Sequence, residues 1–392
     1  MKNTIEDRSV ISNLPVLLPI QILGRGLAVQ RNGLLPYENH LRAALDWIES
    51  AHQVVEKGIS KGFDLLRWRW AAAYPETTGY TIPTLLHAAE RLGEERYREL
   101  ALALADWLLA ESAPEGGVAH WQLKQAPVVF DTGQVMFGWL AAYDATQDER
   151  YLQAASRAAD WLVSIQDPQG VWLKNQHLGV AKTIDTRVAW ALLVLHKRSG
   201  QNAWLEAARR NLEWAVGQQE TMGWFYNCSF TPGGDTFTHT LVYTAEGLLE
   251  CGLLLDEIRW IDAARLTADA LLKNQQTDGR LASSYGPGWR ATSKSSCLTG
   301  NCQAGLVWLQ LYALTGIEDY ARAAAKAIAF VARTQLVEPA PVQVRGAIAG
   351  SYPITGRYER LKYPNWAVKF FVDALLRLEK QDTFAQLYRF AG

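Results

Sequence analysis

The chain has 392 residues, a formal net charge of −1 at pH 7 and a hydrophobic content of 49%. The near-neutral balance gives no broad basic surface for nucleic acid or for an anionic membrane, and no run of about 18 apolar residues predicts a membrane-spanning helix. The four cysteines are too few for a disulfide framework and lack the histidines of a zinc site, so we expect buried thiols and neither a metal nor another cofactor.

The first 37 residues are predicted to be irregular, because six prolines and glycines interrupt them. They contain no basic start followed by an apolar core, which a secretory signal would show. We therefore expect a cytoplasmic protein with one folded domain over 38–392.

Helical spacing of apolar residues first appears in 38–57, which we predict to be one helix. Five pairs of helices follow, and a single helix over 364–380 comes last. The pairs span 77–92 and 94–111, 131–146 and 148–165, 185–199 and 201–218, 239–255 and 257–274, and 299–315 and 317–335. The first helix of each pair is apolar on nearly all sides, which is typical of a buried helix, whereas the second has one apolar stripe and a charged face.

Four threonines mark the starts of successive buried helices at a constant interval. Thr78, Thr132, Thr186 and Thr240 are 54 residues apart, and a period of this length indicates an array of repeated helical units. Six buried and six amphipathic helices, with 38–57 as an outer one, fit an all-α toroid of the (α/α)6 type. We expect the N-terminal outer helix to close the ring against the C-terminal inner helix.

The connections at the two ends of this toroid differ. Short turns with Gly93, Gly200 and Gly316 join the helices within pairs, whereas long segments rich in glycine and aromatic residues lead into the buried helices. Binding and catalytic residues are more often found on such loop-rich ends. The N-termini of the buried helices also point there, and their dipoles favour an anionic group such as a carboxylate.

Asp131 and Asp185 precede two of the repeated threonines, on neighbouring buried helices. Packed helix axes lie about 8–10 Å apart, so the two carboxylates could lie roughly 5–10 Å apart, which covers both geometries used by glycoside hydrolases. Different surroundings could divide such a pair into an acid and a base. Alternatively, each aspartate only caps its helix, because aspartate is a preferred N-cap.

His239 stands at the equivalent position of the next buried helix and is the third predicted catalytic residue. A histidine there could act as a general acid or base near neutral pH, or it could be a hydrogen-bonded structural residue.

The predicted substrate-binding residues are polar and aromatic side chains of the helix starts and the long loops. Arg187 and Arg290 could hold a substrate carboxylate by paired hydrogen bonds, or they could form ordinary ion pairs. Flat aromatic rings could pack on sugar rings or belong to the core. The predicted set is Glu76, Gln134, Arg187, Tyr243, Trp172, Trp224, Tyr226, Tyr285, Trp289, Arg290, Asn301, Tyr352 and Asn365.

The predicted toroid looks like the six-hairpin (α/α)6 glycosidase superfamily. The segment QDPQGVW (166–172) is similar to the Gln-x-x-x-Gly-x-Trp turns of that superfamily and also resembles repeats of triterpene cyclases. The segment FDTGQV (130–135) resembles the aspartate-containing segment of unsaturated glucuronyl hydrolases, although the fuller His-Asp-x-Gly-Phe pattern of that family is absent. The resemblance implies that Asp131 and Asp185 are the acid/base candidates.

Uronyl epimerases and polysaccharide lyases share this toroid and use tyrosine, histidine and arginine, which keeps His239, Tyr243 and Arg290 as candidates. We therefore expect an enzyme that hydrolyses or lyses a uronic-acid-containing oligosaccharide or polysaccharide. The alternatives are a sugar epimerase of the uronyl or N-acylglucosamine type and a non-catalytic glycan-binding protein. Triterpene cyclases need an aspartate-rich motif, and prenyltransferases and lanthionine cyclases need cysteine and histidine zinc ligands, neither of which we find.

Overall fold

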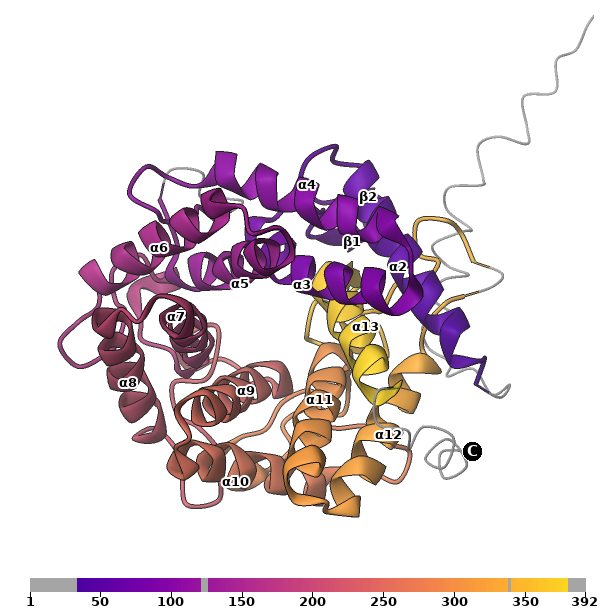
Figure 1. Ribbon diagram of the computed structural model, residues 1–392. Coiled ribbons are helices and arrows are strands. Elements are labelled where there is room, and N and C mark those ends of the chain that lie inside the picture. The colour runs from indigo at the N-terminus through magenta and orange to yellow at the C-terminus, as the bar shows by residue number, and fades with distance from the viewer. Residues whose placement is uncertain (1–33, 121–125, 338–339, 380–392) are drawn as a thin grey trace, which may run out of the picture.

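The computed structural model describes residues 34–120, 126–337 and 340–379. Within these ranges twelve α-helices form an inner and an outer ring (Figure 1). The inner helices are α3 (Pro75–Leu92), α5 (Val129–Thr146), α7 (Thr186–Ser199), α9 (Thr238–Leu255), α11 (Leu298–Thr315) and α13 (Asn365–Glu379). The outer helices are α2 (Tyr37–Gln53), α4 (Glu95–Glu111), α6 (Glu149–Ser164), α8 (Asn202–Val216), α10 (Ile258–Asn274) and α12 (Glu318–Ala332).

The predicted all-α (α/α)6 toroid is confirmed, and each predicted helix starts within two residues of its observed start. The first helix is shorter than predicted, because the chain turns after Gln53 and Glu56 and Gly58 take positive φ angles of 62° and 69°. Residues 1–33 of the predicted irregular segment and residues 380–392 of the predicted domain lie outside the described residues.

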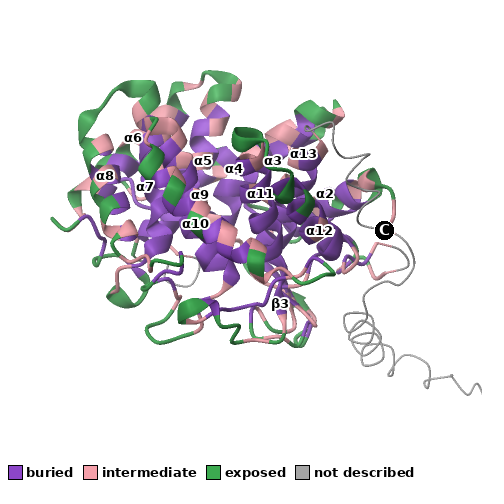
Figure 2. Cartoon of the chain, turned by 90° about the horizontal axis from the view of Figure 1, so that it is seen from below, coloured by how far each residue is buried: buried purple, intermediate pink, exposed green. Residues whose placement is uncertain are grey.

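Burial follows the two rings, with buried residues concentrated between the inner helices and exposed ones on the outer faces (Figure 2). All four cysteines are buried free thiols, as expected. Among the described residues, no helix is long and apolar enough to cross a membrane.

Glutamine side chains tie neighbouring outer helices together. The Gln166 amide donates to the carbonyl oxygen of Gly170 at 3.2 Å and to a carbonyl of the next outer helix at 2.9 Å. Gln275 does the same, to Gly279 at 3.0 Å and to the following helix at 2.9 Å. Both glycines have positive φ and lie directly against the backbone of that next helix. The Gln-x-x-x-Gly motif is therefore a structural clamp between repeats.

A small sheet joins the two ends of the ring. Strand β1 (Gly62–Asp64) pairs antiparallel with β2 (Arg69–Trp70) on one side and with β5 (Lys362–Pro364) on the other. Gly62 permits this approach, because a Cβ there would lie 2.3 Å from the carbonyl oxygen of Tyr363. In Figure 1 the N-terminal helix α2 and the C-terminal helix α13 lie side by side. The predicted closure between these two helices is thus present. In a second short pair, β3 (Ser296–Cys297), directly before α11, pairs antiparallel with β4 (Ser351–Tyr352), which follows α12.

Candidate active site

A cavity of about 700 Å³ lies where the inner helices begin, at the loop-rich end of the toroid. Its lining comes from the starts of four inner helices and the loops before the inner helices, and it includes six tyrosine, phenylalanine and tryptophan rings. The lining includes Lys61, Tyr74, Glu76, His120, Phe130, Asp131, Asn175, Gln176, His177, Lys182, Phe230, His239, Tyr243, Tyr358, Glu359 and Trp366.

Helices α3 and α5 approach each other closely at two glycines. A Cβ on Gly79 would lie 2.5 Å from the Cα of Val135, and one on Gly138 would lie 2.6 Å from the carbonyl oxygen of Gly79. Only glycine allows this backbone contact. It brings the first turns of the two helices together, and with them the carboxyls of Glu76 and Asp131.

Glu76 and Asp131 form an interacting pair of acids. The Tyr74 side chain lies beside both carboxyls and opposes the rise of their pKa values. Burial raises the pKa of Glu76 to about 7. Burial, followed by the nearby charge of Glu76, raises the pKa of Asp131 well above its usual range, against the opposing effect of Lys61. Burial and the charge of Glu76 therefore both favour the protonated form of Asp131.

Neither predicted aspartate serves as a helix cap. Asp131 lies in the first turn of α5, after the N-cap Val128, and Asp185 occupies the N-cap position of α7 without a capping hydrogen bond. The Oδ2 atom of Asp131 and the Oδ1 atom of Asp185 are buried and have no hydrogen-bond partner among the described residues. The capping alternative therefore does not account for these two carboxyls.

Asp185 lies behind the cavity wall rather than in it, and only 1% of its surface is exposed. Its Oδ2 accepts a hydrogen bond of 2.7 Å from the Gln176 amide, which does line the cavity. Burial raises the pKa of Asp185 to about 7, while Gln176 and Lys182 oppose that rise. Because Gln176 both hydrogen-bonds to Asp185 and lines the cavity, a change in the charge of Asp185 can alter the hydrogen bonding of an amide in the cavity wall.

His239 lines the cavity as a neutral imidazole. Its Nδ1 donates to Oε1 of Gln303 at 2.7 Å, and burial lowers its pKa to about 3. The ring packs against Tyr243, with ring centroids 4.2 Å apart. His239 can thus accept a hydrogen bond through Nε2, but it does not carry a charge at neutral pH.

Two lysines bring positive charge to the wall. Lys61 lies over the rings of Tyr74 and Trp366, at 5.7 and 5.4 Å from their centroids. Lys182 stands near Asp185, and burial lowers its pKa. Together with the N-termini of the inner helices, these cations make the cavity suitable for an anionic ligand.

Arg187 lies deeper than the cavity, beneath the ring of Tyr243 at 4.6 Å. Its Nε donates to Oε1 of Gln134 at 2.9 Å, and it forms a buried ion pair with Glu246. Arg187 and Glu246 line a separate hollow of about 340 Å³ between the inner helices. The structure therefore brings Tyr243 into the cavity lining and places Arg187 and Gln134 below it.

Most of the other predicted binding residues lie outside the cavity lining. Trp172, Trp224 and Trp289 are buried, and each donates its Nε1 to a carbonyl oxygen, at 2.7–2.9 Å. The remaining ones are the buried Tyr285, Asn301 and Asn365, the partly exposed Tyr352, and the exposed Tyr226 and Arg290. Asn301 and Asn365 hydrogen-bond to the loop backbone, at 3.3 Å to the oxygens of Gly279 and Ser60.

Several charged and polar lining residues were not predicted from the sequence, among them Lys61, Tyr74, Gln176 and Lys182. Tyr74 and Lys182 stand directly before helix starts, so a search of those positions could have found them. Lys61 precedes β1, and nothing in the repeat indicates that the ring closure brings it to the cavity. Within the described ranges, no group of three or more histidine, cysteine or acidic side chains is arranged to hold a metal ion.

Solved structures support the toroid fold. No protein-family model matches the sequence, and no curated protein matches it. An unsaturated glucuronyl hydrolase specific for heparin is 14% identical, with a TM-score of 0.71 over 88% of this chain and 98% of that one. The unsaturated glucuronyl hydrolase of Bacillus sp. GL1 is 17% identical, with a TM-score of 0.71 over 89% and 98% of the two chains. The Streptococcus agalactiae enzyme is 12% identical, with a TM-score of 0.67 over 96% and 98%.

These similarities define the class of architecture, an (α/α)6 toroid like that of the unsaturated glucuronyl hydrolases. Two different aspartate-to-asparagine variants of the S. agalactiae enzyme have been solved, one of them in complex with dGlcA-GalNAc6S. At 12–17% identity the resemblance shows the fold alone, and function has to be argued from the cavity.

Proposed function

We propose that the protein is a hydrolase that releases an unsaturated uronic acid from the end of an oligosaccharide. The observation that carries the proposal is a buried carboxyl, Asp131, beside a second one, Glu76, in the wall of an aromatic cavity that also presents Lys61 and Lys182. Burial and the nearby charge of Glu76 raise the pKa of Asp131, which favours its protonated form. The fold shared with unsaturated glucuronyl hydrolases supports the same class of substrate.

The cavity suits one or two sugar rings that carry a carboxylate. Its volume of about 700 Å³ is within the usual range for small-molecule sites. Rings such as Tyr243 and Trp366 offer flat apolar faces for the sugar. The carboxylate would be held by Lys61, Lys182 and the helix N-termini, since the two lysines are the cationic side chains of the cavity lining.

The chemistry of the substrate matches a buried neutral acid. A uronic acid with a double bond between C4 and C5 is an enol ether, because the ring oxygen is attached to C5. A proton from Asp131 adds to C4, and positive charge develops on C5 and the ring oxygen. Water adds to C5 and returns a proton to the Asp131 carboxylate. The resulting hemiketal opens, and the ring-opened sugar expels the second sugar as an alcohol.

The surrounding groups serve this cycle in distinct ways. Glu76, once ionised, disfavours loss of the proton from Asp131. His239 stays neutral and can accept a hydrogen bond from a substrate hydroxyl or from water. Asp185 is proposed to act through Gln176, by orienting its amide toward the sugar. The three predicted catalytic residues therefore have three different proposed roles.

The proposal is tested with an unsaturated glucuronyl disaccharide, by following the ultraviolet absorbance of its double bond. The natural protein should consume the double bond and release the second sugar. Asp131→Asn should lower kcat at least 100-fold, as expected for loss of a general acid. Asp262→Asn, which changes an exposed aspartate of α10, is the matched control and should behave as the natural protein. Sugar release with the double bond intact would contradict the proposal and favour another reaction.

A further inference from the structure

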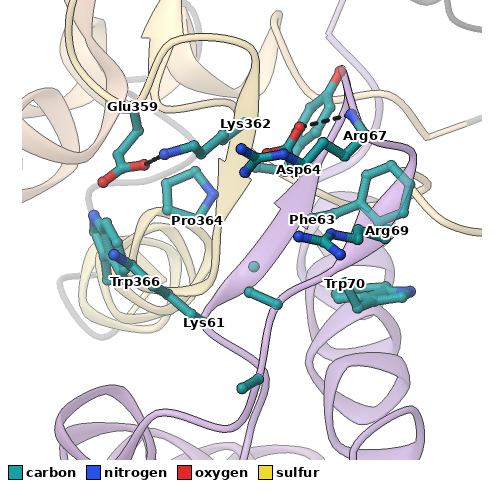
Figure 3. A pocket seen from close by; sticks show the side chains of 14 residues that line it. Lys61, Phe63, Asp64, Arg67, Arg69, Trp70, Glu359, Lys362, Pro364 and Trp366 are labelled. Atoms are coloured by element: carbon teal, nitrogen blue, oxygen red, sulfur yellow. Dashed lines mark hydrogen bonds and ion pairs between the residues drawn. The ribbon is translucent and has the colours of Figure 1, made fainter. Parts of the chain in front are cut away.

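A second pocket opens beside the catalytic cavity and shares a wall with it. Lys61, Glu359 and Trp366 line both hollows. The second pocket has a volume of about 450 Å³ and is formed by the three-stranded sheet β2-β1-β5 and the start of α13 (Figure 3). The two hollows are therefore adjacent, with these three side chains between or beside both of them.

The pocket is predominantly basic, with four cationic side chains and two carboxylates, and we call it the basic annex. Its cations are Lys61, Arg67, Arg69 and Lys362, and its carboxylates are Asp64 and Glu359.

Both carboxylates of the basic annex are already engaged. Lys362 pairs with Glu359 at 2.9 Å, and Arg67 pairs with Asp64 at 3.4 Å. The Arg67 side chain is 66% exposed, so its ion pair is weak. Arg69 has no ion pair among the described residues and is exposed. The annex therefore offers positive charge that the protein itself does not neutralise.

Aromatic side chains complete the basic annex. Trp366 and Lys61 lie on one side of the hollow, and Trp70 and Arg69 lie on the other (Figure 3). Trp70 is held from behind by Trp47, with ring centroids 5.0 Å apart. Arginine beside a flat indole is a combination suited to a sugar that carries an anionic group, because the indole packs on the ring and the guanidinium holds the anion.

The backbone around the basic annex is held in an unusual conformation. Trp68, at the tip of the β1–β2 hairpin, and Glu359, in the shared wall, have φ angles of 48° and 44°. Such angles are uncommon for side chains of this size and persist where the surroundings impose them, often at ligand sites. The hairpin is fixed to β5 by the register Phe63↔Tyr363. The arginines thus project from an anchored hairpin.

We propose that the basic annex binds an anionic group on the sugar that follows the unsaturated uronic acid. That group is a sulfate ester or a second carboxylate. The sulfate is a tetrahedral oxyanion and the carboxylate a planar one, and arginine binds both through paired hydrogen bonds. The inference rests on the proposed function, because it places the unsaturated sugar in the neighbouring cavity. It makes the protein selective for acidic oligosaccharides over those with a neutral second sugar.

The experiment compares three substrates that share the unsaturated glucuronyl end. Their second sugars are neutral, sulfated, or a further uronic acid. The natural protein should show a kcat/KM at least tenfold higher for one or both charged substrates than for the neutral one. In the double variant Arg67→Gln and Arg69→Gln this preference should fall about tenfold, which corresponds to about 1.4 kcal/mol, mainly through a higher KM. Arg157→Gln, on the outer helix α6, is the control and should retain the preference.

A second measurement does not depend on the double variant. Raising the salt concentration should weaken the natural protein's preference for charged substrates, because the arginines are exposed and salt screens exposed charges. The single variant Arg69→Gln should lower the preference by itself.

The outcomes separate the two proposals. The basic-annex proposal is overturned, and the proposed function left intact, by either of two results. One is turnover of all three substrates with no preference among them, and the other is a preference that both the double variant and Arg69→Gln retain. No turnover of any of the three refutes the proposed function, and the annex with it. A preference for the sulfated substrate alone, lost in the variants, supports the annex and identifies sulfate as its anion, and a preference for the second uronic acid alone identifies a carboxylate.

Discussion

Glu76 is expected to control the pH at which Asp131 loses its proton. Both carboxyls are buried beside the Tyr74 side chain, and two groups separated by two hydrogen-bond lengths are roughly 5.5 Å apart. At that distance two negative charges repel by about 3 kcal/mol with an effective dielectric constant near 20. This repulsion raises the pKa of Asp131, and attraction by Lys61 opposes it.

The variant Glu76→Gln removes this repulsion and retains a hydrogen-bond acceptor for Tyr74. The pKa of Asp131 should then fall, although burial still holds it above its usual value. Because only protonated Asp131 can donate, activity should be lost at a lower pH than in the natural protein. We expect the alkaline limb of kcat/KM to move down by about one to two pH units.

The assay is the pH dependence of kcat/KM for an unsaturated glucuronyl disaccharide. Glu115→Gln, a change at an exposed glutamate, serves as the control and should leave the profile in place. An alkaline limb that stays where it is, or moves to higher pH in Glu76→Gln, would refute the reasoning that Glu76 holds the proton on Asp131.

Three further predictions concern stability, measured by chemical denaturation. Burial raises the pKa of Asp185 to about 7, so the protonated carboxyl contributes fully to the free energy of unfolding below about pH 4, and this contribution is lost as the pH rises through 7. In Asp185→Asn the fall in the free energy of unfolding over this pH range should be smaller by up to about 4 kcal/mol. A pH dependence of stability that is unchanged in the variant would contradict this prediction. Glu246→Gln leaves Arg187 buried without its ion pair and should cost about 3–5 kcal/mol; a cost below about 1 kcal/mol would show that the pair is unimportant. Gly279→Ala places a Cβ 2.1 Å from a backbone oxygen and should lower the free energy of unfolding by at least about 3 kcal/mol. Gly200→Ala, also at positive φ but with nothing within 4 Å of its Cβ, should lower it by about 1–2 kcal/mol. Equal losses of stability would mean that the Gln-x-x-x-Gly clamp at Gly279 is not tightly packed.

The sequence predicted the toroid well because its signals are local. Each inner helix is apolar on most sides and each outer helix has one apolar stripe, so the period of 54 residues could be read without knowledge of tertiary contacts. The sheet that closes the ring was not predicted. Its strands β1 and β5 are short and lie about 300 residues apart, and no local pattern records such a pairing.

The same repeat was less informative about the site. It aligned Asp131 with Asp185, but α5 begins two residues before Asp131, whereas α7 begins one residue after Asp185. Successive residues of a helix point about 100° apart, so this offset is enough to place one carboxyl in the cavity wall and the other behind it. The partner of Asp131 is instead Glu76, through a glycine contact that depends on helix packing.

Aromatic residues were the hardest to assign. Trp172, Trp224 and Trp289 sit in glycine-rich loops at the functional end, which made them candidates for sugar binding. In the structure each is buried and donates a hydrogen bond from its indole nitrogen to a backbone carbonyl oxygen. Composition cannot distinguish a tryptophan that anchors a loop from one that lines a cavity. Trp366 lines the cavity from the start of α13.

Reaction of an unsaturated glucuronyl disaccharide in deuterated water tests the central claim most directly. The Asp131 proton exchanges with solvent, so the account predicts one deuterium at C4 of the released sugar acid, loss of the double bond, and an unlabelled second sugar, all observable by nuclear magnetic resonance. Deuterium at C5 without cleavage, or cleavage that leaves C4 unlabelled, would contradict protonation by Asp131 and the hydrolase proposed from it.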